Sequence, residues 1–404
     1  MANDSLGKAK ATKNDEFYTV YDYIQKEVNA YLEFNPDTFR DKVVLLPCDD
    51  PEWSNFTKFF AQNFERLGLK KLISTSYATD SKKKDGQMNI FDFVTEFEKK
   101  SPEYDEEKTK EKGKIFTLTC RSSNKVDIND LKWKYLNGDG DFQSEEVTAL
   151  RDEADIIITN PPFSKFRLFV AWIMEAKKKC LIIGTQNAIT YKEVFPLIMD
   201  NKLWIGATNN GKDMVFEVPE GAQIAQGDRD KAAKLGYVGN YTRLGNACWF
   251  TNLEHGRRHQ PLSLMTMEDN LKFSKHKTLI ENGYLKYDNY DALEVPFIDA
   301  IPSDYNGTMG VPITFIDKYC PEQFDITGIT LGNTVDYPMT KIYKNAIQHN
   351  KDGSTQGGSK VNTRATILVS EEPDDIVYYT ADDINGYLLS IYPRILIKRK
   401  ENEL

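Results

Sequence analysis

The chain has 404 residues, of which 40% are hydrophobic and 28% are charged, and its formal net charge is −9. This composition is typical of a globular protein, and the length indicates two or three domains. The negative charge disfavours nucleic-acid binding over the whole surface, although net charge hides local basic patches. No apolar run is long enough to span a bilayer, and the first residues lack the apolar segment of a signal peptide. We therefore expect a cytoplasmic location and no membrane partner.

The cysteines predict neither a disulfide framework nor a metal site. They are odd in number, widely spaced and free of any CxxC pair, so reduced, buried thiols are the expectation. His255 and His259 are four residues apart, but no HExxH glutamate lies between them and Gly256 interrupts a helix there. The cysteines are Cys48, Cys120, Cys180, Cys248 and Cys320.

The first quarter of the chain alternates helix and strand patterns. Apolar residues at helical spacing predict a helix over 20–32, which the Asn35-Pro36 pair ends. The continuously apolar residues 42–47 predict a buried strand. Asp50-Pro51 is typical of a helix start, and Gly68 of the end of that helix.

After a strand predicted at 70–78, the charge-dense residues 79–113 predict an exposed insertion. The turn residues Asn209-Asn210-Gly211 predict a hairpin between two apolar segments. The remaining elements predicted for this half are strands at 114–120, 155–159, 180–185 and 246–253, and a helix at 164–178. This order predicts an open, mostly parallel α/β sheet, in which ligands bind at the carboxyl ends of the strands.

The second half differs in composition and predicts a separate domain. It is rich in Tyr, Pro and Asn-Gly, and its helical patterns are weak. We expect an α+β or β-rich domain over 256–404, following a first domain at 1–255. Residues 348–360 are expected to form a polar loop, and residues 394–400 the last strand.

The segment ADIIITNPPFSKF, residues 154–166, carries the clearest chemical signal. The apolar strand delivers Asn160 to the rim of the sheet. Pro161 and Pro162 fix their own φ angles and lack N–H groups, so they make a stiff loop rich in carbonyl oxygens. The Asn160 oxygen adds another acceptor, and Phe163 offers a ring for stacking. The loop is suited to hold a planar aromatic amine.

Such a loop favours transfer of a methyl group to that amine. The lone pair of an aromatic amine is delocalised into the ring, which makes the nitrogen a poor nucleophile. Two acceptors on its hydrogens favour tetrahedral geometry and free the lone pair. No metal and no covalent intermediate is required, because a stiff loop positions its acceptors before the substrate arrives.

The motif resembles the catalytic motif of amino-group DNA methyltransferases, in the form typical of the N6-adenine enzymes. NDEFYT (14–19) resembles the family's N-terminal cofactor motif, and GDGDF (138–142) resembles the segment lining the cofactor's adenine. VVLLPCDDPEWSNF, GNACWFTNL and VPITFIDKYCPEQF resemble the EcoRI-type adenine-specific methyltransferases over most of the chain. The order of the motifs is similar to the gamma arrangement of the family.

The resemblance implies a Rossmann-like methyltransferase sheet, S-adenosylmethionine as methyl donor, and an adenine flipped out of double-stranded DNA. It also implies a C-terminal target-recognition domain and a possible cognate restriction endonuclease in a bacterial or phage-encoded system. The catalytic residues it implies are Asn160, Pro161, Pro162 and Phe163. The cofactor-binding residues it implies are Tyr18, Thr19, Pro47, Asp49, Asp50, Asp141, Phe142 and Asn160.

Basic residues in two short segments are the candidates for contacts with DNA phosphates. They are Arg257, Arg258, Arg394, Lys398 and Arg399. An edge strand with charged ends explains residues 394–400 equally well. Three other functions keep the same loop: methylation of cytosine N4, of RNA, or of a protein glutamine amide. A catalytically inactive nucleic-acid-binding relative is a further alternative.

Overall fold

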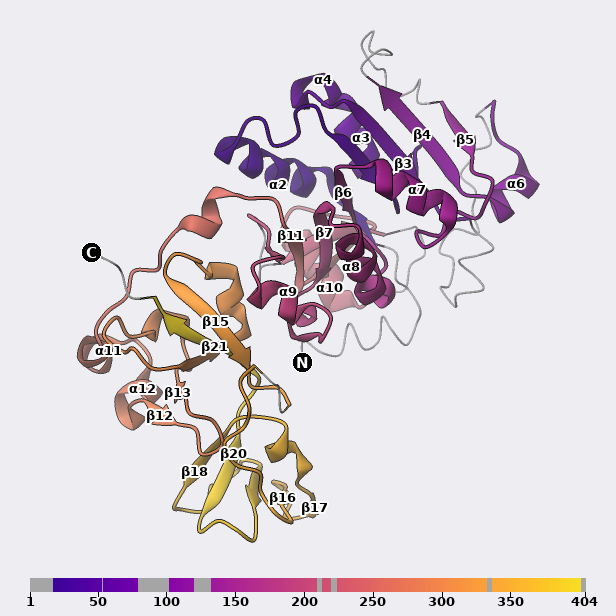
Figure 1. Cartoon of the computed structure of the whole chain (residues 1–404). Helices are drawn as coiled ribbons and strands as arrows, with labels where there is room; N and C mark the ends of the chain where they lie inside the picture. The colour runs from indigo at the N-terminus through magenta and orange to yellow at the C-terminus, as the bar shows by residue number, and fades with distance from the viewer. Residues whose placement is uncertain are drawn as a thin grey trace. The chain divides into compact units, whose positions relative to one another are not determined.

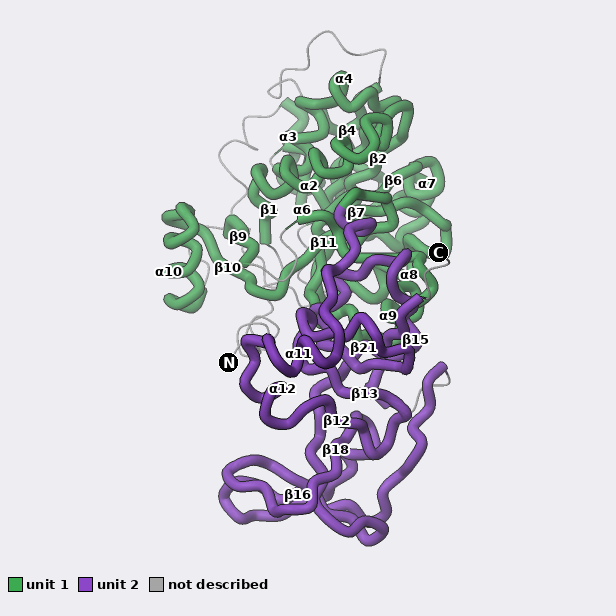
Figure 2. Tube along the Cα trace, turned by 90° about the vertical axis from the view of Figure 1, so that its left-hand side faces the viewer, with its two compact units in different colours: residues 1–256 green, residues 257–404 purple. Residues whose placement is uncertain are grey.

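A computed structural model describes residues 17–52, 54–78, 102–119, 132–208, 213–218, 224–332 and 336–400. The chain divides into two compact units, Met1–Gly256 and Arg257–Leu404, which Figure 2 distinguishes by colour. Among the described residues, no helix combines the length and the apolar character that crossing a bilayer requires.

A mixed eight-stranded sheet forms the centre of the described part of unit 1 (Figure 1). In spatial order its strands are β5 (Trp133–Tyr135), β4 (Lys114–Thr119), β3 (Lys71–Thr75), β2 (Val43–Leu46), β6 (Ile156–Thr159), β7 (Lys179–Thr185), β11 (Ala247–Thr251) and β8 (Trp204–Ile205). The four central strands β3, β2, β6 and β7 are parallel, and the outer pairings are antiparallel. The protein is therefore a mixed α/β protein with a largely parallel centre.

Helices cover both faces of this sheet. The helices in the described part of unit 1 are α2 (Tyr21–Phe34), α3 (Asn55–Gln62), α4 (Phe64–Leu67), α6 (Glu106–Glu111), α7 (Glu145–Glu153), α8 (Phe166–Glu175), α9 (Phe195–Met199) and α10 (Gln226–Lys234). Val44, Leu46, Ile156 and Ile158 share one buried cluster with apolar residues of α2 and α3. Side chains alternate along a strand, so the residues between them face α7 and α8 on the other side. Both faces of the central strands are thus apolar, which explains their unbroken apolar runs.

The strand order reverses between β2 and β6. From β2 the chain proceeds to β3 on one side, whereas β6 is followed by β7 on the other side. In an open α/β sheet, ligands bind outside the carboxyl ends of the strands at this point of reversal. The segments that leave these two strand ends are residues 47–50 and 160–163, which are the two segments predicted to bind cofactor and substrate.

Most predicted elements of unit 1 are confirmed, and two are wrong. The second helix begins at Asn55 rather than at Pro51, because Ser54 caps it: the Ser54 hydroxyl accepts a hydrogen bond from Phe56 N. The hairpin around 209–211 does not form. Its two flanking strands belong to different sheets, since β8 pairs with β11 while β9 (Met214–Glu217) pairs with β1 (Tyr18–Thr19) and β10 (Tyr241–Leu244). The turn itself, Cys120 and residues 79–101 of the predicted insertion lie outside the described residues.

Unit 2 contains two five-stranded sheets within its described residues. The first has the order β12 (Leu285–Lys286), β13 (Leu293–Glu294), β14 (Met309–Pro312), β21 (Arg394–Arg399), β15 (Phe324–Ile329). The second has the order β17 (Thr355–Gly357), β16 (Ile347–His349), β19 (Tyr378–Thr380), β20 (Tyr387–Ser390), β18 (Thr366–Val369). The helices are α11 (Met267–Phe273) and α12 (Lys277–Asn282).

Two expectations for unit 2 are corrected. Residues 348–360 are not simply a polar loop, because β16 and β17 pair as a hairpin in which Gln348 lies opposite Gln356. The strand β21 is not an edge strand, since it lies between β14 and β15. Its alternation of charge and apolar residues therefore does not mark a sheet edge.

Candidate active site

Asn160 is the first residue after β6, and its side chain is held in one orientation. The Asn160 amide nitrogen Nδ2 donates a hydrogen bond of 2.6 Å to the backbone oxygen of Phe17. The amide oxygen Oδ1 is buried and has no hydrogen-bond partner among the described residues. A buried polar atom without a partner is costly, and it marks a place where a ligand or water binds. The free atom is an acceptor, as an amine substrate requires.

Phe163 and Thr19 belong to the two segments that this contact joins. Phe163 opens the short 3-10 turn Phe163–Lys165, and its ring lies 6.2 Å from that of Phe17 with an angle of 31° between the planes. Thr19 belongs to β1, is 3% exposed, and its hydroxyl has no partner among the described residues. The N-terminal segment and the segment 160–163, which is predicted to be catalytic, are therefore adjacent.

Asp49 follows β2 and is buried between the two segments at the strand ends. Its Oδ1 accepts a hydrogen bond of 2.6 Å from the Ser54 hydroxyl, and its Oδ2 accepts one of 2.7 Å from the Thr159 hydroxyl. Burial raises the pKa of Asp49 to about 7; the two hydrogen bonds oppose this rise and the nearby Asp50 charge adds to it. Because both oxygens are engaged and the residue is only 6% exposed, the predicted direct contact with a cofactor is not supported for Asp49.

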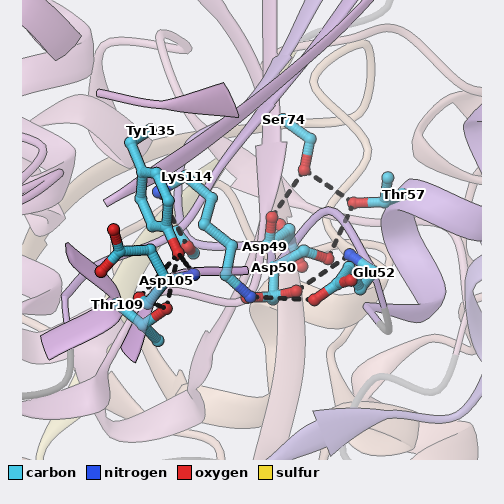
Figure 3. Close-up of polar contacts among 10 residues, drawn as sticks. Asp49, Asp50, Glu52, Thr57, Ser74, Asp105, Thr109, Lys114 and Tyr135 are labelled. Carbon is cyan, nitrogen blue, oxygen red and sulfur yellow. Dashed lines mark hydrogen bonds and ion pairs between the residues drawn. The ribbon is translucent and has the colours of Figure 1, made fainter. Parts of the chain in front are cut away.

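The two acidic residues that follow Asp49 in the chain form ion pairs with one buried lysine. Lys114, the first residue of β4, is 3% exposed, and its ammonium lies 3.3 Å from Asp50 Oδ2 and 3.0 Å from Glu52 Oε2 (Figure 3). The ammonium also lies 4.7 Å from the centre of the Trp133 ring. Asp50 additionally accepts a hydrogen bond from Glu52 N, so it shapes a turn before the helix rather than capping it.

The segment predicted to line an adenine lies next to the catalytic turn. The Asp141 carboxylate lies 3.3 Å from the ammonium of Lys165, which also lies 5.3 Å from the centre of the Tyr77 ring at the end of β3. Phe142 is 5% exposed and packs edge-on against Phe169 of α8 at 5.0 Å. Asp141 is thus part of the site's periphery, whereas Phe142 is mainly a core residue.

Sequence reasoning missed several residues of this arrangement. Lys114 opens a predicted strand, and no local pattern signals that it meets two carboxylates far away in the chain. The role of the Phe17 backbone oxygen has no signature in side-chain chemistry, although Phe17 lies within the NDEFYT motif. Residues 14–16 of that motif are outside the described residues. Ser54 is a common helix cap, so its position before an apolar stripe was the one available signal.

The basic residues proposed for DNA contacts all lie in unit 2, and most are engaged within it. Arg394 is half-buried and forms an ion pair with the buried Glu294, whose Oε1 lies 2.6 Å from the Arg394 Nη2. Arg257 pairs with Asp317, and Arg258 is 8% exposed. Arg394 is therefore committed to the fold of unit 2, and its assignment as a phosphate contact is not retained.

Two basic residues of β21 remain candidates for contacts with DNA phosphates. Lys398 is exposed and Arg399 is half-buried.

Among the described residues, no group of three or more His, Cys, Asp or Glu side chains is arranged to hold a metal ion.

Comparison with known proteins agrees with this geometry. Residues 5–400 match the family model described as adenine-specific methyltransferase EcoRI. No solved structure gives a significant match.

Three curated relatives are similar over most of their length. The type II methyltransferase M.EcoRI of Escherichia coli is 42% identical over 331 residues, which cover 82% of this chain and 90% of that protein. M.MgeORF184P of Mycoplasma genitalium is 34% identical over 80% of this chain and 84% of its own length. M.MpnI of Mycoplasma pneumoniae is 32% identical over 90% of this chain and 97% of its own length. The chain therefore belongs to the EcoRI family of adenine-specific methyltransferases, and it is an adenine-specific DNA methyltransferase.

Proposed function

We propose that the chain transfers a methyl group from S-adenosylmethionine to the N6 amino group of an adenine that is flipped out of double-stranded DNA. The observation that carries this proposal is the buried acceptor Oδ1 of Asn160, which has no hydrogen-bond partner among the described residues and is oriented by the Phe17 backbone oxygen at the carboxyl end of β6. Family membership supports a Rossmann-like fold for the central sheet. It also supports unit 1 as the catalytic domain and unit 2 as the target-recognition domain.

The residues at the strand ends fit an S-adenosylmethionine molecule. S-adenosylmethionine supplies an electrophilic methyl group carried on a sulfonium sulfur. The Thr19 hydroxyl, which has no partner in the part of the chain that the structure describes, and the half-buried Tyr18 offer polar contacts for its methionine end. Asp50 favours a positively charged ligand, and Pro47 and Asp141 are the further proposed contacts, whereas Phe142 supports them from the core. Lys114 limits the negative charge that Asp50 and Glu52 present.

The catalytic segment acts by position and electrostatics. The Asn160 oxygen and the Pro161 carbonyl accept hydrogen bonds from the two hydrogens of the adenine amine, and Phe163 stacks on the base. Pro162 keeps the loop rigid. These residues would hold the amine nitrogen in line with the methyl carbon of bound S-adenosylmethionine, which would supply the methyl group and keep the electron pair of its carbon–sulfur bond on sulfur, while the methylated nitrogen would release one proton to water. No group in this step requires covalent attachment to the protein.

In the recognition domain, Lys398 and Arg399 are the retained candidates for phosphate contacts, with Arg257 and Arg258 engaged in the fold. The type II relatives suggest that the enzyme acts within a bacterial or phage-encoded restriction–modification system. A cognate endonuclease is then the functional partner. The two enzymes share one target site in DNA, and methylation protects this site from cleavage.

Labelled methyl transfer tests the proposed function. Unmethylated DNA, RNA and protein are each incubated with the enzyme and labelled S-adenosylmethionine, and the methylated DNA is digested to nucleosides. We expect label in N6-methyladenine from DNA only, and sequencing of modified adenines then gives the recognition site. Label in N4-methylcytosine, in RNA or in protein would contradict the proposal.

A further inference from the structure

Asp49 connects the two segments that leave β2 and β6 at the point where the strand order reverses. One carboxylate oxygen accepts from Ser54, the residue that caps α3, and the other accepts from Thr159. Thr159 is the last residue of β6 and directly precedes Asn160. A single side chain therefore touches both the start of a helix on the cofactor side and the base of the catalytic loop.

The backbone of Asp49 is fixed from a third strand. Asp49 N donates a hydrogen bond of 3.0 Å to Thr75 O, and the Ser74 hydroxyl donates one of 2.5 Å to Asp49 O. Both Ser74 and Thr75 belong to β3. The backbone that carries the carboxylate is thus held in place by β3. A shift of Thr159 would therefore break or lengthen its hydrogen bond to Asp49.

The geometry also explains why Asp49 acts through its neighbours. It is buried, and each oxygen already accepts one hydroxyl hydrogen, so protonation would turn one oxygen into a donor and disturb one of the two hydrogen bonds. The groups that set its charge state are Ser54 on α3, Thr159 on β6 and Asp50 on the same loop. Burial raises its pKa to about 7, so the carboxylate titrates close to neutral pH.

We infer that Asp49 is a positioning residue: through Thr159 it fixes the backbone of Asn160, while Phe17 fixes the side chain of Asn160. The inference rests on the proposed transfer at Asn160. A misplacement of about 1 Å in an active site lowers rates about a hundredfold, so holding the catalytic residue from two sides has a measurable effect.

Thr159→Val tests the link because it removes the hydroxyl with little change of shape. We expect the single-turnover rate of methyl transfer to fall by at least about tenfold. The Kd of S-adenosylhomocysteine, measured by calorimetry, should change by less than about twofold, since Thr159 is fully buried and its hydroxyl is engaged by Asp49. Thr159→Ser keeps the hydroxyl and should restore most of the rate.

Thr251→Val is the matched control. Thr251 is also fully buried in the central sheet, but it lies in β11, two strands away from β6, and its hydroxyl donates to Cys180 O at 2.7 Å rather than to Asp49. We expect this variant to lose stability but to keep the wild-type single-turnover rate. A wild-type rate in Thr159→Val, or a loss of cofactor affinity that matches the loss of rate, would overturn the inference.

Asp49→Asn provides a second test that is independent of Thr159. The wild-type rate should rise with pH through about 7 as the carboxylate ionises, and the variant should be slower and lack this rise. An unchanged rate and pH profile in Asp49→Asn would also overturn the inference, including the case in which Thr159→Val does not fold. If the wild-type enzyme itself transfers no methyl group to adenine, the proposed function fails instead.

Discussion

The side-chain amide of Asn160 donates a hydrogen bond of 2.6 Å to the backbone oxygen of Phe17, although the two residues are 143 positions apart in the chain. This contact decides which end of the amide is free. With Nδ2 engaged, Oδ1 is left as the buried atom without a partner among the described residues. The orientation suits an amine donor, and it would be wrong for a carbonyl substrate.

The first prediction concerns this free oxygen. Asn160→Ala should lower the single-turnover rate by at least about a hundredfold, because it removes a preorganised acceptor from the reacting amine. The Kd of S-adenosylhomocysteine should change little. Asn252→Ala is the matched control, since it removes a buried amide whose oxygen accepts a hydrogen bond from Cys180 N of β7 and has no part in the segment 160–163. A near wild-type rate in Asn160→Ala would exclude the mechanism.

Phe163→Ala tests stacking on the flipped base. Loss of the ring should weaken binding of a duplex that carries the target adenine by roughly 1–3 kcal/mol. Binding of the same duplex with an abasic site at that position should weaken much less, because no base is present to stack. Phe163→Tyr keeps the ring and should bind both duplexes nearly as the wild type does. Equal losses for the two duplexes would show that Phe163 supports the fold rather than the base.

Lys114→Met should destabilise unit 1. The change leaves Asp50 and Glu52 close together in a buried setting without their cation, and removing one partner of a buried pair costs about 3 kcal/mol or more. Urea unfolding measures this loss. Lys71→Met is the control, since the Lys71–Glu153 pair is more exposed and should contribute less than about 1 kcal/mol. Equal losses in the two variants would contradict a special role for Lys114.

Asp49 should make stability depend on pH in a defined direction. Its pKa in the folded protein, about 7, is above the unfolded value of 3.8, so the folded state binds more protons between these values. The free energy of unfolding contributed by this group therefore falls as pH rises from about 4 to about 7. Three pKa units correspond to roughly 4 kcal/mol.

The comparison of wild type with Asp49→Asn isolates this effect from other titrating groups. The stability of the variant relative to the wild type should increase from pH 4 to pH 7, as measured by urea unfolding at several pH values. A constant difference over this range would mean that Asp49 titrates as it does in the unfolded chain.

Arg394→Met should affect folding rather than DNA binding. It leaves Glu294 buried without its guanidinium, which should cost about 3–5 kcal/mol of stability. The salt dependence of DNA binding should stay unchanged for the folded fraction. Lys398→Ala, an exposed position on the same strand, should instead reduce the slope of log K against log salt by about 1 if Lys398 contacts a phosphate.

Local sequence patterns determined much of this protein. The apolar runs at 42–47, 155–159 and 180–185 predicted the central strands, because a strand covered on both faces needs an unbroken apolar run. The Asn160-Pro161-Pro162-Phe163 motif predicted the catalytic loop, because prolines restrict the backbone wherever they occur. These features depend on neighbouring residues alone.

Only the tertiary structure decided which distant groups meet. The hairpin predicted at 209–211 was wrong because strand pairing depends on residues that are distant in the chain. The strand β9 pairs with β1 and β10 rather than with β8. Arg394 was taken for a surface charge because its partner Glu294 is 100 positions away. The bridge from Asp49 to Thr159 and the Asn160–Phe17 contact likewise join segments that are remote in sequence, and their geometry arises when the parallel strands bring their carboxyl ends to one edge of the sheet.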